Sequence, residues 1–314
     1  MDIIDEIILK SIKNKTVSGE YLSKITGISR TAVWKRIKKL EKSGYKISHS
    51  HEGYRLLNET PYLIPFEIKK CLRTEKIGKT YVFFFEIDST NKYGKLNEFP
   101  DGTVILAESQ TKGKGRKGRK WISSKGKGLY FSIVLKRDYP AKDIMKLSLL
   151  FPLSVKKALQ SYVKKSIKIK WPNDLYINNK KFAGFLIETE IEGSDICKII
   201  AGIGININNS SEEFGEIKEK ATSLKIEEGK ELDRKKIFCS ILESIEHHLK
   251  QFGNFNLTKE IEKDLLWRGE RVVIVDEGIE GILVGLDESG GIKISKGKEI
   301  ITIYSGDLSL RRIN

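Results

Sequence analysis

The sequence predicts an α/β (α+β) domain that follows a winged helix-turn-helix and precedes a small all-β barrel. Three observations support this fold class. Residues 1–62 combine helical spacing of apolar residues with a glycine turn, residues 63–267 alternate helix and strand patterns, and residues 268–314 consist of short β-branched runs broken by glycines. A chain of 314 residues is long enough to contain three domains with these residue ranges.

The N-terminal segment has the pattern of a helix-turn-helix. Residues 3–12 are amphipathic at helical spacing, and a second, short helix is expected to end at Gly27. Ser29 has the side chain of a helix N-cap and is expected to open a third helix. Residues 44–57 alternate in the manner of a small hairpin, as in winged members of this class.

The outer face of the third helix is expected to contact DNA. Val33, Ile37 and Leu40 fall on one helical face and are expected in the core. Residues 1–60 contain twelve Lys or Arg and seven Asp or Glu, a balance that favours an anionic partner. The alternative is a small helical protein-protein domain with a solvated basic face. The predicted DNA-binding residues are Ser29, Arg30, Thr31, Trp34, Lys35 and Lys38.

Residues 63–267 are expected to form the α/β domain. Two long segments, 141–163 and 233–252, carry apolar residues at helical spacing. The turn at residues 192–195 joins two strand patterns and favours antiparallel pairing. The predicted strands lie at 102–109, 128–136, 167–171, 181–191 and 196–208.

The pattern changes from Arg268 onward to short β-branched runs separated by glycines. Short strands at such close spacing are typical of a small all-β barrel. The predicted strands of this barrel lie at 271–275, 281–287, 291–295 and 299–310.

Composition restricts the class of protein. A content of 39% hydrophobic and 32% charged residues is ordinary for a soluble globular protein and excludes a disordered chain. The formal charge of +15 favours an anionic partner such as nucleic acid, a nucleotide or an acidic protein. No apolar segment reaches the roughly 18 residues of a membrane span, and no basic start with an apolar run opens the chain. We therefore expect a cytoplasmic protein without a membrane partner.

The three cysteines, Cys71, Cys197 and Cys239, stand far apart and form no C-x-x-C pair. This spacing suggests neither a disulfide framework nor a zinc site. We expect all of them to be buried thiols with a structural role.

Residues 110–121, QTKGKGRKGRKW, form a loop of three glycines and six Lys or Arg. A solvated charge run is the simplest interpretation of such a cluster. The glycines also match the G-x-G-x-x-G spacing of dinucleotide-binding turns, but that motif needs a helix after the loop, and residues 128–136 predict a strand. The Walker pattern is excluded as well, because Arg119 and Lys120 follow Gly118 where Lys and Ser or Thr are required.

Several separated motifs together give the sequence a specific resemblance. They are DSTN at 88–91, QTKGKGRKGRKW at 110–121, KWPNDL at 170–175, KFAG at 181–184, GIGININ at 202–208 and GDLSLR at 306–311. In this order and spacing, and with the helix-turn-helix in front, essentially the whole chain resembles the bacterial biotin-protein ligases of the bifunctional form, which also act as biotin operon repressors. The resemblance implies that the C-terminal β-barrel is SH3-like.

The resemblance also implies a two-step reaction. A ligase of this family makes biotinyl-5'-AMP from biotin, ATP and Mg²⁺, and passes biotin to a lysine of a biotin carboxyl carrier protein of acetyl-CoA carboxylase or a related carboxylase. Joining a carboxylate to the α-phosphorus of ATP brings like charges together, so the site must supply cations and backbone N–H donors. The loop at residues 110–121, called the glycine-rich loop below, contains both cations and backbone N–H donors. Biotinyl-AMP would be the corepressor of biotin genes.

The site residues are implied by the same resemblance. Arg116 matches the arginine that retains the adenylate, and Lys181 matches the lysine that bridges biotin and phosphate. Lys170 and Asp174 complete the predicted catalytic set, with Asp174 also a ligand of Mg²⁺. The predicted biotin-binding residues are Ser89, Thr90, Asn91, Gln110, Lys114, Gly115, Arg116, Lys181 and Gly184. The predicted ATP-binding residues are Arg116, Arg119, Lys120, Trp121, Asn206 and Arg311.

Other interpretations stay open from the sequence. A lipoate ligase has a related catalytic fold, although KWPND, GRKGRKW and the helix-turn-helix favour biotin. A non-catalytic transcription factor that senses a metabolite is the second alternative. Taken singly, some motif residues also have structural interpretations: WPND as a capped turn, Trp171 as a core aromatic and Asn206 as a strand-end amide.

The chain departs from the family pattern at two positions. Lys114 stands where an arginine is frequent, which preserves the charge. Trp34 stands where a small polar residue is common on the recognition helix, and an indole cannot form the bidentate base contacts of Asn or Arg. The like-charged loop is expected to be mobile until the adenylate orders it. The ordered loop is then expected to favour a ligand-induced homodimer on operator DNA, in competition with the carrier.

Overall fold

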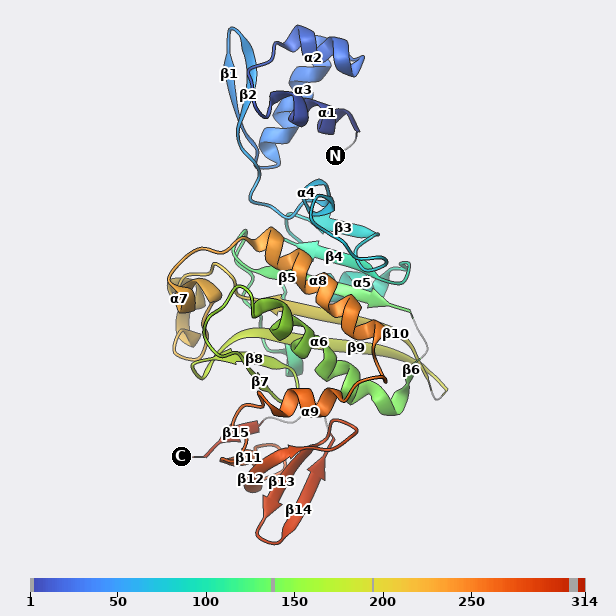
Figure 1. Ribbon diagram of the computed structural model, residues 1–314, viewed down its shortest axis with the longest axis vertical. Helices are drawn as coiled ribbons and strands as arrows, with labels where there is room; N and C mark the ends of the chain where they lie inside the picture. Colours follow the sequence, from blue (N-terminus) through green and yellow to red (C-terminus); the bar gives the residue numbers. More distant parts are fainter. Residues whose placement is uncertain (1–2, 137–138, 194, 305–309, 314) are drawn as a thin grey trace. The chain divides into compact units, whose positions relative to one another are not determined.

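The computed structural model describes residues 3–136, 139–193, 195–304 and 310–313 (Figure 1). The chain divides into two compact units, residues 1–67 and residues 68–314. The predicted domain boundaries after residues 62 and 267 stay predictions.

The first unit contains a helix-turn-helix followed by an antiparallel hairpin. Gly27 ends the second helix in the left-handed conformation at φ 69°, and Ser29 Oγ accepts a hydrogen bond from Ala32 N–H at 3.2 Å. These two features set the turn between the helices, and the hairpin is the wing predicted from the sequence. The elements are α1 (Ile3–Ile12), α2 (Gly19–Thr26), α3 (Arg30–Lys42), β1 (Lys46–Ser50) and β2 (Gly53–Asn58).

The core of the first unit includes the predicted inner face of α3. Val33, Ile37 and Leu40 are fully buried there, together with Leu22 of α2. Burial of this face directs the opposite face of α3 to the solvent. The short helix α4 (Pro65–Lys69) follows the hairpin at the boundary between the units.

The second unit is built on a mixed sheet. β3 and β4 are parallel, and the remaining neighbours are antiparallel. The strands predicted for this domain are confirmed, including the antiparallel pair across residues 192–195. The short strands β3, β6 and β8 were not predicted. The order along the sheet is β3 (Tyr81–Phe84), β4 (Thr103–Ala107), β5 (Leu129–Leu135), β10 (Asp195–Ile205), β9 (Lys180–Glu192), β8 (Asp174–Ile177) and β7 (Lys168–Lys170), and β6 (Tyr139–Pro140) pairs with β10.

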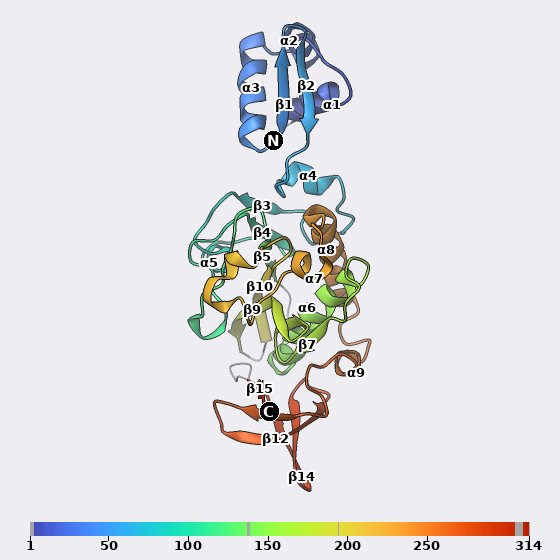
Figure 2. The same cartoon turned by 90° about the vertical axis from the view of Figure 1, so that its left-hand side faces the viewer.

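Helices cover both faces of this sheet. The two predicted helices, α6 (Ile144–Leu159) and α8 (Arg234–Lys250), lie together on one face, and α5 (Thr90–Leu96) lies on the opposite face (Figures 1 and 2). Leu147, Phe151 and Val155 of α6 are fully buried, as their helical spacing predicts. Two shorter helices complete this part of the chain, α7 (Leu224–Glu228) and α9 (Leu257–Glu262).

The C-terminal part of the second unit is an antiparallel sheet. The predicted β-branched runs form its strands, although the run at 299–310 includes residues 305–309, which lie outside the described residues. The SH3-like class of this sheet stays a prediction. The strand order is β14 (Glu299–Ile303), β13 (Ile292–Lys296), β12 (Ile279–Leu286), β11 (Arg271–Ile274) and β15 (Leu310–Arg312).

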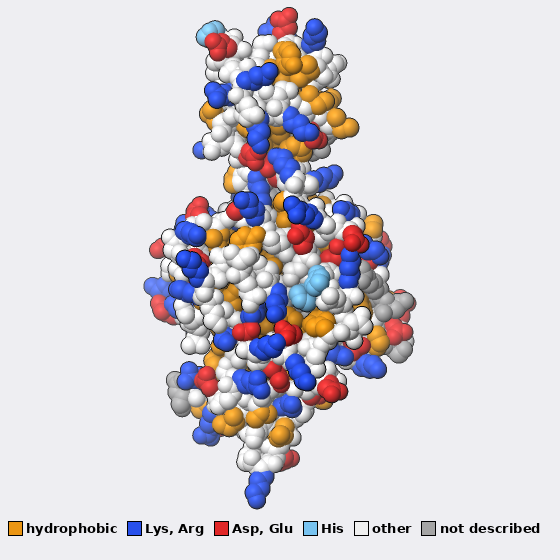
Figure 3. All heavy atoms as spheres, in the orientation of Figure 1, with side chains coloured by type: hydrophobic (Ala, Val, Ile, Leu, Met, Phe, Trp, Pro, Cys, Tyr) orange, Lys and Arg blue, Asp and Glu red, His pale blue; other side chains and the backbone are white. Residues whose placement is uncertain are grey.

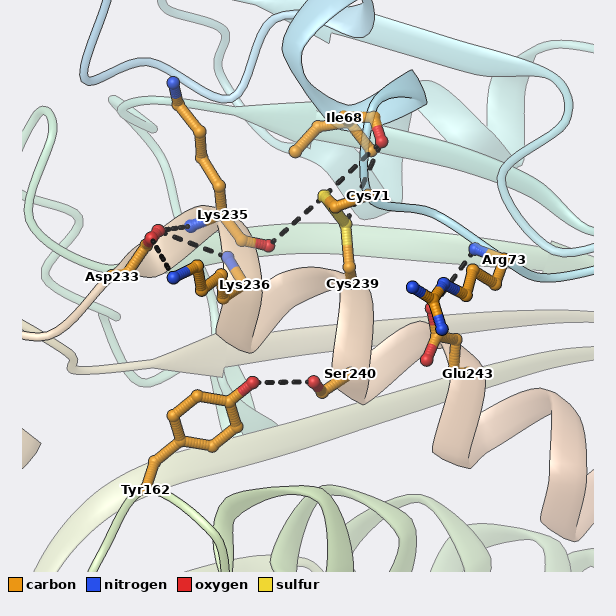
Figure 4. Close-up of a disulfide and its surroundings, with 10 residues drawn as sticks. All are labelled: Ile68, Cys71, Arg73, Tyr162, Asp233, Lys235, Lys236, Cys239, Ser240 and Glu243. Carbon is orange, nitrogen blue, oxygen red and sulfur yellow. Dashed lines mark hydrogen bonds and ion pairs between the residues drawn. A yellow bond between two sulfur atoms is a disulfide. The ribbon is translucent and has the colours of Figure 1, made fainter.

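A disulfide joins Cys71, just after α4, to Cys239 on α8 (Figure 4). The expectation of unpaired thiols is therefore wrong for this pair. The Cα atoms are 6.2 Å apart, within the range for disulfides, but 168 residues separate the cysteines in sequence, so their spacing gave no sign of the pairing. Cys197 is unpaired but partly exposed, contrary to the expectation that it is buried.

Charged side chains are spread over the surface. On the face shown in Figure 3, Lys and Arg are interspersed with Asp and Glu. The net charge of +15 therefore does not identify a single partner surface in this view, and a site must be located from local geometry. Within the described ranges of the chain, no helix has the length and apolar character needed to cross a membrane.

Candidate active site

One cavity within residues 68–314 collects the predicted ligand-binding residues. Its volume is about 590 Å³, which is in the range of small-molecule sites. Their individual roles stay predictions, but the fold brings them together from distant parts of the sequence. All the residues predicted for catalysis, biotin or ATP line the cavity: Ser89, Thr90, Asn91, Gln110, Lys114, Gly115, Arg116, Arg119, Lys120, Trp121, Lys170, Asp174, Lys181, Gly184, Asn206 and Arg311.

The glycine-rich loop contributes to the cavity wall. It connects the antiparallel strands β4 and β5, so the predicted strand-loop-strand is confirmed and a dinucleotide-binding turn is excluded. Its backbone folds back on itself, because Gly115 N–H donates to Arg119 O at 2.7 Å and Trp121 N–H donates to Gly113 O at 2.9 Å. A Cβ atom at Gly113 would lie 2.9 Å from Trp121 O, so this close approach favours glycine.

Arg116 is oriented by the turn between β7 and β8. Its Nη1 donates to Asn173 Oδ1 at 3.0 Å, and Asn173 Nδ2 donates to Phe185 O at 2.5 Å. These contacts connect the loop to β9 through one amide side chain. A planar guanidinium in a fixed orientation is suited to bind phosphate and carboxylate oxygens.

Lys181 lies between a carboxylate and an aromatic ring. Its Nζ is 2.6 Å from Asp174 Oδ1 and 5.4 Å from the centre of the Trp121 ring. The indole packs so closely on Gly184 and Gly204 that a Cβ at either position would come within 2.9 Å of it. Trp121 Nε1 is buried and has no hydrogen-bond partner among the described residues, so it can donate to a ligand.

A polar network lies at the N-terminal end of α5. Gln110 Oε1 accepts a hydrogen bond from Thr90 N–H at 2.9 Å, and Ser132 Oγ is 2.8 Å from Thr90 Oγ1 and 2.6 Å from Asn91 Oδ1. Asn91 Nδ2 donates to Glu188 Oε2 at 2.9 Å. Amides and hydroxyls of this kind suit a neutral polar head group. Sequence analysis missed Ser132 and Glu188, because they lie inside strands and belong to no motif.

Lys170 is a partly buried cation beside two aromatic residues. Its Nζ lies 5.3 Å from the centre of the Tyr176 ring and 5.0 Å from that of Trp267. Burial lowers the pKa of Lys170 to about 8, although the charge of Asp174 opposes this shift. Burial also raises the pKa of Tyr176, so its hydroxyl stays protonated near neutral pH.

Four other predicted residues that line the cavity come from three separate segments of the chain. Asn206, at the end of β10, donates from Nδ2 to Thr222 O at 3.1 Å, so it also has the structural role of a strand-end amide. Arg311 is on β15, where its backbone pairs with Val273. Lys114 and Lys120 form a β-bridge within the glycine-rich loop. The part of the GDLSLR motif at 306–309 lies outside the described residues.

The cavity also contains residues that sequence analysis did not identify. Asn173 lies inside the WPND motif, which therefore contained the signal for it. Phe214 and Ile217 lie between β10 and α7 in a mainly polar stretch, and two apolar residues in a polar loop are a signal that can mark a binding segment. The missed lining residues include Asn173, Tyr176, Phe214, Ile217 and Lys220.

The residues present fit a Mg²⁺ ion that arrives with a nucleotide. Among the described residues, no group of three or more His, Cys, Asp or Glu is placed to hold a metal ion. Asp174 is the acidic side chain among the described residues that line the cavity. One carboxylate together with substrate phosphates is a common Mg²⁺ environment, so Asp174 fits such an ion.

The predicted DNA-binding residues lie on the outer face of α3. Trp34 is 48% exposed, and Arg30 and Lys38 stand one turn before and after it. Lys38 differs from the others because its Nζ is 2.8 Å from Glu41. All the predicted residues are exposed: Ser29, Arg30, Thr31, Trp34, Lys35 and Lys38.

Known families and proteins match both units. The biotin/lipoate A/B protein ligase family matches residues 84–206, and an HTH domain matches residues 6–55. The chain is 34% identical over 307 residues to the bifunctional ligase/repressor BirA of Bacillus spizizenii, with 94% of each chain covered. It is 29% identical over 302 residues to the bifunctional ligase/repressor BirA of Escherichia coli, with 94% of this chain and 92% of that protein covered.

A solved structure agrees with these matches. The biotin protein ligase from Aquifex aeolicus in complex with biotin and ATP has a TM-score of 0.66 and 39% identity, and the match covers 75% of this chain and 100% of that chain. The match to the Bacillus protein extends over nearly the whole of both chains. On this basis the chain belongs to the family of bifunctional ligase/repressor BirA proteins.

Proposed function

We propose that the cavity condenses biotin with ATP to biotinyl-adenylate, and that the chain transfers biotin to a lysine of a biotin carboxyl carrier protein. The helix-turn-helix unit represses transcription at operator DNA, with biotinyl-adenylate as corepressor. These substrates place the protein in the cytoplasm. One observation carries the ligase assignment: a single cavity joins a polar network to many cations. Its basic residues are Lys114, Arg116, Lys117, Arg119, Lys120, Lys170, Lys181, Lys220 and Arg311.

The polar end of the cavity is suited to the head group of biotin. The amide and hydroxyl groups of Thr90, Asn91 and Gln110 can donate to and accept from a neutral ureido ring. The apolar part of the ligand then lies beside Trp121, which packs on Gly184 and Gly204. This arrangement directs the biotin carboxylate toward Lys181.

The cationic end supports the adenylation step. A carboxylate oxygen of biotin forms a bond to the α-phosphorus, the bond from that phosphorus to the bridging oxygen breaks, and pyrophosphate leaves. Lys181 and Arg116 lower the repulsion between the two anions and stabilise charge on the equatorial oxygens. Asp174 Oδ1 lies 2.6 Å from Lys181 Nζ and holds this ammonium in the cavity. Mg²⁺ held by Asp174 and the phosphates would add further positive charge there.

In the transfer step, the amine of a carrier lysine attacks the acyl carbon, loses a proton, and AMP leaves. The intermediate must stay bound until the carrier arrives. Arg116 is suited to this role because its orientation is fixed by Asn173 while its guanidinium lines the cavity. The lysine therefore meets an adenylate that is held in place.

The repressor function requires the two units to be coupled. We propose that biotinyl-adenylate orders the glycine-rich loop and strengthens a homodimer, which places two copies of α3 on a two-fold operator. Apo-carrier competes with the dimer for the same surface and consumes the adenylate. In this scheme the C-terminal sheet is an SH3-like barrel that contributes Arg311 to the nucleotide side of the cavity.

A lipoate ligase is the second candidate, because the matching family includes both biotin and lipoate ligases. Lipoate has no ureido ring, so the polar side chains of Thr90, Asn91 and Gln110 that line the cavity would face an apolar dithiolane. This mismatch favours biotin.

Exchange of labelled pyrophosphate into ATP tests the proposal. The full chain should catalyse exchange when biotin is added and should not do so with lipoate alone. Added apo-carrier should then become biotinylated, with the expected mass increase on one lysine. Exchange that depends on lipoate, or no exchange with either acid, would contradict the proposed function.

A further inference from the structure

A residue outside all the family motifs contacts a cation of the cavity. Trp267 lies between α9 and β11, and the centre of its ring is 5.0 Å from Lys170 Nζ. The Tyr176 ring is 5.3 Å from the same nitrogen, and Tyr176 Oη is 3.4 Å from it. The two ring centres are 6.5 Å apart with an interplanar angle of 58°, so one ammonium contacts both rings.

The segment before Trp267 is attached to β7. Ile169 N–H donates to Asp264 O at 2.8 Å, and Leu266 N–H donates to Ile169 O at 2.8 Å. Trp267 itself has a φ of 64°, in the left-handed region that bulky residues rarely adopt. Such strain persists only where the surrounding structure enforces it, and it clusters at functional sites. Here the strained residue is the one whose ring contacts Lys170.

The rings attract Lys170 without neutralising it. No carboxylate forms an ion pair with Lys170 within the described part of the chain, and Asp174 is the anion that acts on it at longer range. The cations Lys181, Arg311 and Arg119 repel Lys170. A cation–π contact supplies attraction without placing a carboxylate against the ammonium, which stays open to an anionic ligand.

The sheet order indicates which part of the substrate Lys170 meets. Ser132 of the polar network is on β5, Lys181 is on β9, and Lys170 is on β7, two strands beyond β9. Neighbouring strands are about 4.8 Å apart, so the backbone of Lys170 is about 10 Å further along the sheet than that of Lys181. With the biotin head group at β5 and the α-phosphorus near Lys181, the β- and γ-phosphates extend toward Lys170.

We propose that Trp267, together with Tyr176, is a positioning residue that holds Lys170 for the pyrophosphate leaving group. The inference rests on the proposed adenylation reaction. As the bond between the α-phosphorus and the bridging oxygen breaks, the electron pair stays on that oxygen, and pyrophosphate carries the charge away. An ammonium held by rings rather than by a carboxylate can stabilise this charge.

Pyrophosphate exchange with separate KM values for ATP, pyrophosphate and biotin tests the proposal in the full chain. Trp267→Leu should raise the KM for ATP and pyrophosphate about five- to tenfold, the effect of losing a partly desolvated cation–π contact, and leave the KM for biotin unchanged. Trp267→Phe keeps a ring and should recover most of the loss. Transfer from preformed biotinyl-adenylate to the carrier involves no pyrophosphate and should be unaffected.

A matched control and a double variant separate positioning from general damage. Phe85→Leu removes a ring that lies 5.6 Å from Lys125 Nζ outside the cavity lining, and should change none of these constants. In a Lys170→Met background, Trp267→Leu should add no further loss. If Trp267→Leu does not fold, as judged by circular dichroism, Tyr176→Leu removes the other ring and should raise the same two KM values.

Three results would overturn the proposal. They are an equal loss in exchange and transfer, a fully additive double variant, and an unchanged pyrophosphate KM in Lys170→Met. Absence of biotin-dependent exchange in the unmodified chain would be a different result, because it would refute the proposed function itself.

Discussion

The cavity and the outer face of α3 both present cations to anionic ligands, but they hold these cations differently. In the cavity, Lys181 is 2.6 Å from Asp174 and Arg116 is 3.0 Å from Asn173. On α3, Arg30 and Lys35 are exposed and form no ion pair among the described residues. Lys181, which lies on β9 and is paired with Asp174 on β8, is therefore preorganised, whereas the α3 side chains lose conformational freedom only when DNA binds.

This difference predicts how each region responds to substitution. In a preorganised site, each charged side chain is held beside one particular atom of the reacting substrate. Removing one such side chain therefore has a large effect on the reaction rate. On a solvated face, each cation contributes a modest, salt-dependent share of a distributed interaction. The substitutions below test this contrast, from the largest expected effect to the smallest.

Lys181→Met should have the largest effect. Removing one preorganised charge at the reacting phosphate is expected to lower the rate of adenylation about 10²- to 10³-fold. Lys180→Met is the matched control, because Lys180 is adjacent in sequence but does not line the cavity. Single-turnover formation of biotinyl-adenylate measures both variants. Equal rates for Lys181→Met and the unmodified chain would contradict the assigned role.

The disulfide between Cys71 and Cys239 should stabilise only the unit that contains it. Cys71 and Cys239 close a loop across 168 residues, and loss of a native disulfide typically lowers the free energy of unfolding by about 2–5 kcal/mol. Cys239→Ser should therefore lower the melting temperature of residues 68–314 and leave that of residues 1–67 unchanged. Calorimetry measures both transitions. Cys197→Ser is the control, and an equal effect of both substitutions would argue against the pairing.

Arg116→Gly should release the intermediate. Loss of charge-assisted hydrogen bonds is expected to make adenylate dissociation about ten- to a hundredfold faster. The variant should still form biotinyl-adenylate and should label lysines of bystander proteins. Streptavidin blots of added albumin measure this leakage. Retention of the adenylate as in the unmodified chain would rule out the proposed role of Arg116.

Substitutions on α3 should have the smallest individual effects. Arg30→Ala and Lys35→Ala are each expected to weaken operator binding several-fold. Each should also reduce, by about one, the steepness with which the logarithm of the binding constant falls with the logarithm of the salt concentration. Lys38→Ala should have a smaller effect, because Glu41 already lies 2.8 Å from its ammonium. Binding measured across a range of salt concentrations distinguishes them. If all of these variants and the unmodified chain show the same salt dependence of operator binding, α3 is not part of the DNA interface.

Sequence patterns predicted the long elements well, because periodicity accumulates over many residues. The helix at Ile3–Ile12 and the strand pair β9–β10 are examples. The four-residue strands β3 and β8 were missed. The cavity residues in motifs were predicted from the resemblance, since composition and spacing alone left a solvated charge run as an alternative for the loop.

The residues that sequence analysis missed depend on tertiary structure. Ser132 and Glu188 are polar residues within otherwise strand-like runs, and their positions became meaningful only when α5 packed beside them. Trp267 lies in no motif and contacts Lys170 only because its segment is attached to β7. The Cys71–Cys239 disulfide was also not predicted, because cysteine pairing depends on the tertiary structure and cannot be deduced from spacing in the sequence alone.

The central claim is that one cavity both forms and retains biotinyl-adenylate. Native mass spectrometry of the full chain after incubation with biotin, ATP and Mg²⁺ tests it most directly. The account predicts a bound mass equal to biotinyl-AMP, which persists after desalting in the unmodified chain and is lost on desalting from Arg116→Gly. In Lys181→Met this mass should appear far more slowly. Biotin and ATP bound together without condensation, or retention unaffected by Arg116→Gly, would contradict it.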